Sequence, residues 1–119
     1  MSREALLTWV DVCPLDELMV DRGVCVLAEG VQVAVFRVAP DDDLYAVSNF
    51  DPIGRAFVMS RGIVGSRGDI PKVASPLYKQ NFDLRTGLCL DDPSISLQVF
   101  PIHVADGMVR VGVAGASSA

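Results

Sequence analysis

Short apolar runs rich in valine recur along the chain, separated by glycine, proline or aspartate. The sequence holds 18 valines, and β-branched residues favour strands over helices. Strands are therefore expected in the first half at Thr8–Val12, Gly23–Ala28, Val31–Val38 and Leu44–Ser48. Both faces of Val31–Val38 are largely apolar, which predicts a central strand covered on both sides.

Two tight turns join pairs of these strands. Glu29–Gly30 and Asp106–Gly107 each stand between two apolar runs, a pattern typical of β-hairpins. The second turn is expected to join strands at Gln98–Ala105 and Met108–Val113. Alternation along the first of these predicts one apolar face, formed by Phe100, Ile102 and Val104. His103 is expected on the opposite side, facing solvent.

The middle of the chain, residues 49–87, is dense in glycine, proline and arginine. The run Gly62–Gly68 contains three glycines, which predicts a loop. Short strands separated by loops are expected at Ala56–Ser60, Ile70–Ala74 and Asn81–Leu84. This stretch is therefore interpreted as a small subdomain inserted between the flanking strands.

These elements predict an all-β fold, a small β-sandwich or barrel with an inserted small β subdomain. The 119 residues are enough for one domain with its own hydrophobic core. The domain is expected over residues 8–113, after an N-terminal extension at 1–7 and before a flexible C-terminal tail at 114–119.

Charge and hydropathy exclude several classes of partner. The net charge is −5 and the pI about 4.6, whereas binding to nucleic-acid phosphates or to an anionic membrane needs a basic face. No apolar run approaches the roughly 20 residues of a membrane-spanning helix. The N-terminus also lacks the pattern of a signal peptide. We therefore expect a cytoplasmic protein that binds neither nucleic acid nor membrane.

Residue chemistry alone indicates no catalytic centre. His103 is the only histidine, so a mechanism or metal site that needs two imidazoles is excluded. Cys13, Cys25 and Cys89 are odd in number and widely spaced, which argues against a disulfide framework or a four-thiolate zinc site. No phosphate-binding loop or nucleophile elbow is present. No catalytic residue is assigned.

Two segments carry a resemblance to a known family. Ala46–Gly54 and Val73–Gly87 resemble the two cluster-binding loops of Rieske iron–sulfur domains, which follow the approximate patterns N-x-C-P-H-x-G and C-P-x-H-G-x-x-F-D-L-x-T-G. The framework positions that match are Asn49, Pro52, Gly54, Pro76, Phe82, Asp83, Leu84, Thr86 and Gly87. The resemblance implies a Rieske-like β-sandwich whose inserted subdomain spans about 49–87.

The four ligands of that family are replaced. The resemblance places Asp51 and Ile53 at the first cysteine and histidine positions, and Ser75 and Tyr78 at the second pair. A Rieske cluster needs two thiolates and two imidazoles, and oxygen donors suit a sulfide-bridged cluster poorly. We therefore expect no metal or other cofactor in this chain. Another metal held by Asp51, Ser75 and Tyr78 remains an alternative to hydrogen bonding across the two loops.

Further stretches narrow the resemblance to the small subunit of assimilatory NAD(P)H nitrite reductases (NirD type). The stretches that resemble that family are Ala46–Pro52, Val58–Val64, Val73–Gln80 and Gly87–Asp92. The resemblance implies a non-redox subunit that docks on and organises a large subunit carrying FAD, a [4Fe-4S] cluster and sirohaem. That large subunit would take electrons from NAD(P)H and reduce nitrite to ammonium in nitrate assimilation.

The loops that replace the cluster site are the expected docking surface. The candidate docking residues are Asn49, Asp51, Ile53, Arg55, Leu77, Tyr78 and Lys79. The alternative is that Ile53 and Leu77 only fill the space left by a cluster. Arg61 is interpreted either as a nitrite-binding cation or as an ordinary surface arginine.

Two other functional classes are considered. One is an electron-transfer component, a Rieske-type ferredoxin or oxygenase component, against which the missing ligands argue. The other is a free-standing interaction module on a degenerate Rieske scaffold.

Overall fold

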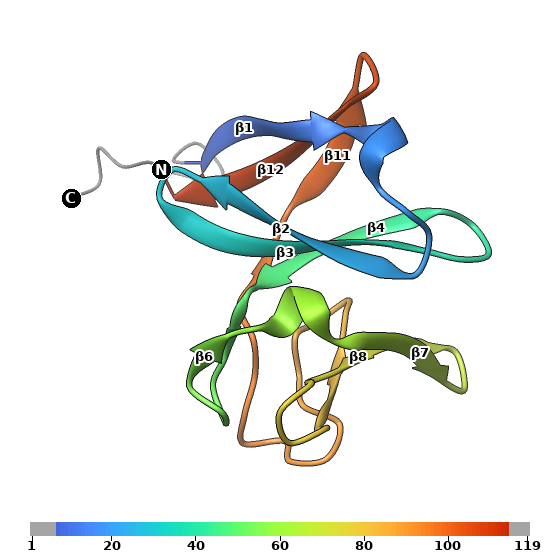
Figure 1. Ribbon diagram of the computed structural model, residues 1–119, viewed down its shortest axis with the longest axis vertical. Helices are drawn as coiled ribbons and strands as arrows, with labels where there is room; N and C mark the ends of the chain where they lie inside the picture. Colours follow the sequence, from blue (N-terminus) through green and yellow to red (C-terminus); the bar gives the residue numbers. More distant parts are fainter. Residues whose placement is uncertain (1–6, 115–119) are drawn as a thin grey trace.

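The computed structural model describes residues 7–114, which form three stacked layers built almost entirely of antiparallel strands (Figure 1). The expected all-β sandwich with an inserted β subdomain is confirmed. The expected N-terminal extension and C-terminal tail lie, apart from Leu7 and Ala114, outside the described residues. No helix in the described part of the chain is long and apolar enough to cross a membrane.

The first layer is a three-stranded sheet in the order β1-β12-β11. Its strands are β1 (Leu7–Pro14), β12 (Met108–Ala114) and β11 (Ile102–Ala105). The predicted turn at Asp106–Gly107 joins β11 to β12, with φ of 54° and 77°. Two consecutive left-handed residues twist the hairpin to match its strands, which explains the glycine.

The second layer is a four-stranded sheet in the order β10-β4-β3-β2. Its strands are β10 (Val99–Phe100), β4 (Asp43–Ser48), β3 (Val31–Val38) and β2 (Arg22–Ala28). The predicted hairpin at Glu29–Gly30 joins β2 to β3. A 3-10 turn, η2 (Leu15–Glu17), leads from the first layer to the second.

The third layer is the insert between β4 and β10. It contains a two-stranded ribbon, β5 (Phe50–Asp51) with β6 (Ala56–Phe57), and a three-stranded sheet in the order β7-β8-β9. The strands of that sheet are β7 (Ile63–Arg67), β8 (Ile70–Ala74) and β9 (Asn81–Asp83). A 3-10 turn, η3 (Met59–Arg61), connects the two parts and lies against the second layer.

Two hydrophobic clusters hold the layers together, and β3 contributes to both. Val33 and Val35 pack between the first and second layers, whereas Ala34, Phe36 and Val38 pack between the second layer and the insert. Because alternate residues of a strand point to opposite faces, the apolar run on both faces of β3 is explained. The predicted central strand is confirmed, with β2 and β4 as neighbours.

Three details of the sequence prediction are wrong. The strand expected at Ala56–Ser60 ends at Phe57, because a 3-10 turn follows. Ile63–Arg67, taken as part of a glycine-rich loop, is a strand because β8 supplies its backbone partners.

The third error concerns the strand expected at Gln98–Ala105. Pro101 divides this segment into two strands, β10 and β11, which belong to different sheets. Phe100 and Ile102 still pack in one hydrophobic cluster, but Val104 is exposed. His103 is exposed as predicted.

Candidate functional site

The two loops that resemble a cluster site are joined by one buried hydrogen bond. Asp51 ends β5 and Ser75 follows β8, and these side chains are 0% and 1% exposed. The Ser75 hydroxyl donates to Asp51 Oδ2 over 2.5 Å. Because this pair occupies the two positions where the family pattern has cysteines, we call it the Asp51–Ser75 pair throughout.

Each member of the pair also organises its own loop in the same way. Asp51 Oδ1 accepts hydrogen bonds from the backbone N–H of Ile53 at 2.8 Å and of Gly54 at 3.1 Å. Ser75 Oγ accepts one from the backbone N–H of Leu77 at 3.2 Å. Aspartate and serine commonly stabilise turns through such contacts two residues ahead. The two loops therefore share one pattern of hydrogen bonds from backbone amides to the side chain that begins the turn.

The same equivalence extends to the end of each loop. The backbone N–H of Arg55 donates to the Asp51 carbonyl at 2.7 Å, and that of Lys79 donates to the Ser75 carbonyl at 3.0 Å. Each bond closes a turn of five residues. Arg55 has φ of 58° and Lys79 has φ of 64°, so each loop ends on a long cationic residue in the left-handed region.

The side chains at the four ligand positions do not fit an iron–sulfur cluster. The Asp51–Ser75 pair is closed on itself by its hydrogen bond. Ile53 has no donor atom and packs against the hydrophobic cluster under the insert. Tyr78 is 64% exposed. Within residues 7–114, no three His, Cys, Asp or Glu side chains gather in a way that would hold a metal ion.

Two of the candidate docking residues, Asn49 and Asp51, are buried. Asn49 is 2% exposed. Its side-chain amide donates to Gln32 Oε1 at 3.0 Å, and its carbonyl oxygen accepts from the backbone N–H of Ser60 at 2.7 Å. Asn49 therefore fastens η3 to the second layer. Like the buried Asp51, it lies inside the fold, where both side chains form hydrogen bonds with other parts of this chain.

The other docking candidates reach the surface to different degrees. Ile53 is half-buried, Leu77 is 46% exposed and Tyr78 is 64% exposed. Arg55 and Lys79 are exposed, and neither forms an ion pair with a described residue. A Cβ atom on Gly54 would lie 2.4 Å from Leu77 Cδ1, so the side chain of Leu77 packs directly on the backbone of the first loop at Gly54.

Sequence reasoning missed two other exposed apolar side chains of the insert. The Phe57 ring contacts the Phe50 ring, with centroids 5.1 Å apart and planes tilted by 60°, and Ile63 is exposed at the start of β7. Apolar residues in short strands are ordinarily assigned to a core, so no pattern in the sequence distinguishes them. Arg61, considered as a nitrite-binding cation, is exposed at the end of η3.

Charge is divided between the insert and the two sandwich layers. Residues 49–87 carry six Lys or Arg and three Asp, and the remainder of the chain carries four Lys or Arg against twelve Asp or Glu. The insert extends to β10 and also contains Asp91 and Asp92, so five aspartates lie in it, of which Asp51 and Asp83 are buried. The exposed surface of the insert is therefore basic although the chain as a whole is acidic.

Other residues of the family-like pattern have structural roles. The carboxylate of Asp83 is buried, which opposes its ionisation, but hydrogen bonds from the guanidinium and backbone N–H of Arg85 hold its pKa below the usual value. Gly87 has φ of 80° and stands so close to the Leu97 carbonyl that a Cβ would lie 2.0 Å away. These positions shape the second loop without facing solvent.

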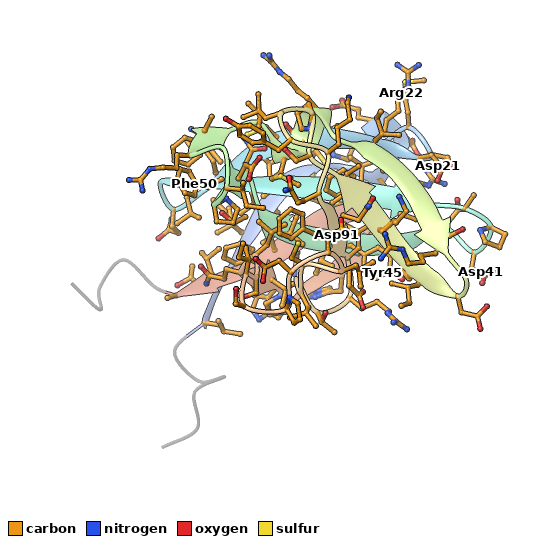
Figure 2. All side chains as sticks on the ribbon, turned by 90° about the horizontal axis from the view of Figure 1, so that it is seen from below. Asp21, Arg22, Asp41, Tyr45, Phe50 and Asp91 are labelled. Carbon is orange, nitrogen blue, oxygen red and sulfur yellow. The ribbon has the colours of Figure 1, made fainter. Side chains whose placement is uncertain are left out.

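A cleft of about 590 Å³ lies away from the two loops, between the β3–β4 turn and the β7–β8 turn. Its rim is acidic and includes Asp21, Asp41, Asp43 and Asp69. Burial, followed by the Asp43 carboxylate, raises the pKa of Tyr45 in its wall. Figure 2 shows Asp21, Asp41 and Tyr45 on one side of the molecule and Phe50 on the opposite side.

The three cysteines are free thiols. Cys89 is buried in the hydrophobic cluster under the insert. Burial raises the pKa of Cys13 and Cys25, so neither is an activated nucleophile. The single histidine, His103, stacks edge-on against Trp9 at 4.4 Å on the outer face of the first layer. The His103 imidazole does not contribute to the two loops, whereas Cys25 Sγ accepts a hydrogen bond at 3.4 Å from the side-chain amide of Asn49, in the first loop.

Comparison with known proteins identifies relatives of the whole described domain. Residues 8–112 match the family described as Rieske-like [2Fe-2S] domain. The nitrite reductase (NADH) small subunit of Salmonella typhimurium is 41% identical over 103 residues, which span 87% of this chain and 95% of that protein. The NMR structure of the Escherichia coli protein NirD covers 92% of this chain and 99% of that one, with a TM-score of 0.83 and 38% identity.

A third relative has a different chain organisation. The nitrite reductase [NAD(P)H] large subunit of Klebsiella oxytoca is 38% identical over 104 residues, which span 87% of this chain but 11% of that protein. In that relative, the counterpart of this whole domain is therefore a small part of a much longer polypeptide.

Proposed function

The chain belongs to the Rieske-like [2Fe-2S] domain family and, within it, to the nitrite reductase (NADH) small subunits, and on this basis we propose that it is the non-redox small subunit of an NAD(P)H-dependent nitrite reductase. It docks on the large subunit and organises it, and it contributes no catalytic residue. The observation that carries the non-redox role is the Asp51–Ser75 pair, which closes the two loops where a cluster would be held.

The chemistry of the reaction belongs to the large subunit in this proposal. Reduction of nitrite to ammonium takes six electrons, and none of the side chains at the four ligand positions of this chain holds a centre that passes electrons on. We expect FAD, a [4Fe-4S] cluster and sirohaem in the large subunit, where they move electrons from NAD(P)H to nitrite. We also expect the complex to act in the cytoplasm, in nitrate assimilation.

The Klebsiella oxytoca relative supports assembly with the large subunit. A domain that is fused to a larger chain in one organism and separate in another commonly binds that larger chain in both. The match spans 87% of this chain, so the domain is present there as a whole rather than as a fragment. This supports a large-subunit partner over a free-standing interaction module.

Reconstitution of the complex tests the proposal. The large subunit is purified alone and then mixed with this chain, and NADH- and NADPH-dependent nitrite reduction is measured together with complex formation by size-exclusion chromatography. We expect a stable complex, a change in nitrite reduction when the chain is added, and an isolated chain without the visible absorption of a [2Fe-2S] cluster. Failure of the two proteins to associate would refute the assignment, whereas a cluster in this chain would restore the ferredoxin alternative.

A further inference from the structure

We propose that Arg55 and Lys79, at the ends of the two loops, form a cationic pair that docks this chain on an acidic surface of the large subunit, with the exposed side chains of Leu77 and Tyr78 as the apolar part of the contact. This surface is called the loop-end surface below. This inference rests on the proposed function and identifies the surface of the chain that binds the large subunit.

The division of charge is the first argument. The chain carries a net charge of −5, yet residues 49–87 hold six basic residues against three aspartates. A molecule with opposite charge at its two ends is turned by the field of a charged partner, so that the complementary end approaches first. The basic insert therefore selects an acidic partner surface, and the acidic layers are directed away from it.

The absence of local partners is the second argument. Arg37 and Arg110, on the sandwich layers, pair with carboxylates, the latter with Asp11 at 2.7 Å, whereas Arg22 forms no ion pair with a described residue. Arg55 and Lys79 are exposed and form no ion pair within residues 7–114. Their charges are available to carboxylates of another chain.

Backbone conformation is the third argument. The left-handed region is favourable for glycine and costs other residues free energy. Arg55 and Lys79 occupy it at equivalent places in the two loops, each closing a five-residue turn on a member of the Asp51–Ser75 pair. Glycine would suit both backbones better, so the long cationic side chains occupy these positions against the local conformational preference. Strained positions of this kind are concentrated where a side chain has a function.

The apolar side chains beside Lys79 complete the surface. Tyr78 is 64% exposed, and Leu77 remains 46% exposed although Gly54 supports it from the first loop. Binding surfaces commonly combine a rigid aromatic or aliphatic centre with charges at its rim. Because hydrogen bonds fix both loops before any partner arrives, little conformational entropy is lost on binding.

Charge-reversal variants test the surface against a matched control. Arg55→Glu and Lys79→Glu are compared with Arg22→Glu, which makes the same charge change at an exposed arginine of β2 without an ion pair in the described chain. Affinity for the intact large subunit is measured at low and high salt. We expect each insert variant to bind at least about tenfold more weakly at low salt with a reduced salt dependence, and Arg22→Glu to bind within about twofold of wild type.

Glycine variants separate docking from folding. In Arg55→Gly and Lys79→Gly we expect a melting temperature equal to or above that of wild type, because the backbone strain is relieved, together with weaker binding to the large subunit. Glu29→Gly is the control, since Glu29 also lies in the left-handed region, with φ of 50°, but in the β2–β3 turn of the sandwich. It is expected to leave binding unchanged.

The outcomes distinguish this surface from the function on which it rests. If the wild-type chain binds the large subunit and all insert variants bind as well as it does, the loop-end surface is wrong and the proposed function stands. If Arg22→Glu weakens binding as much as the insert variants, the effect is one of overall charge and the surface is again wrong. If the wild-type chain does not bind, the proposed function fails and the surface fails with it.

Discussion

Removal of the Asp51–Ser75 hydrogen bond should destabilise the whole fold measurably. In Ser75→Ala, the buried Asp51 Oδ2 loses its hydrogen-bond donor and gains none from solvent. An unsatisfied buried polar group costs roughly 1–3 kcal/mol, and more where charge is involved, so we expect a loss of about 2–3 kcal/mol in the free energy of unfolding. For a domain of this length, that corresponds to a melting temperature lower by roughly 8–12 °C.

Asp51→Ala should cost more, because three hydrogen bonds are lost at once. The side chain accepts from the Ile53 and Gly54 amides as well as from the Ser75 hydroxyl, and we expect a loss of about 3–4 kcal/mol. In the double variant, no group of the pair remains to be left unsatisfied, and beyond Asp51→Ala only the hydrogen bond from the Leu77 N–H to Ser75 Oγ is lost. The loss should therefore exceed that of Asp51→Ala alone by less than about 1 kcal/mol, which corresponds to a coupling energy of about 2 kcal/mol.

Urea unfolding at equilibrium measures these free energies, and the slope with denaturant shows whether the unfolding transition remains comparable between variants. Ser66→Ala, an exposed serine of β7, is the control and should change stability by less than about 0.5 kcal/mol. A coupling energy below about 0.5 kcal/mol between positions 51 and 75 would refute the argument, since the two loops would then be held together by other contacts.

Two further predictions concern the second loop. The pKa of Asp83 is held below its usual 3.8 by Arg85, so the ionised carboxylate stabilises the fold above that pH, and this contribution is lost as the pH falls below it. Urea unfolding at several pH values should show that Asp83→Asn is less stable than wild type at pH 7 and that the difference in the free energy of unfolding disappears in acid. A difference that stays constant with pH would contradict this. Gly87→Ala should cost about 3 kcal/mol or more because its Cβ would lie 2.0 Å from the Leu97 carbonyl. Gly30→Ala, with the same φ but nothing within 4 Å, should cost about 1 kcal/mol in thermal unfolding, and equal losses at the two glycines would show that the close contact is relieved by relaxation.

Most strands of the two sandwich layers can be predicted from local patterns in the sequence. The apolar run of β3 on both faces and the two hairpin turns with glycine at their second position predict neighbours that are close in the chain. The strand Ile63–Arg67 is not apparent in the sequence because Gly65, with Gly62 and Gly68 on either side of the strand, weakens the local preference, and its stability comes from pairing with β8. The division of the strand at Pro101 depends on which sheet each half joins, a choice made by packing rather than by propensity.

The candidate site was only partly predictable for a similar reason. The resemblance in the two loops indicates that residues 51 and 75 lie close together although 24 residues separate them. Asn49 is a docking candidate in the sequence because it lies in the first of the two loops that replace the cluster site. Its burial depends on hydrogen bonds to Gln32 of β3 and Ser60 of η3, which are distant in the sequence and leave no local signal. The exposed apolar residues Phe57 and Ile63 were missed because apolar type alone predicts burial.

Replacing a cluster by a hydrogen bond changes what the two loops depend on. A metal centre links the loops through bonds that exist only when the metal is bound, so its binding energy becomes part of the folding energy. The Asp51–Ser75 pair, the half-buried Ile53 and the support of Leu77 by Gly54 are all built from the chain itself. The geometry of the loop ends is therefore set by folding alone. A docking subunit that carries no electrons benefits from this, because its partner-facing cations stay in place whatever the iron supply or the redox state of the complex.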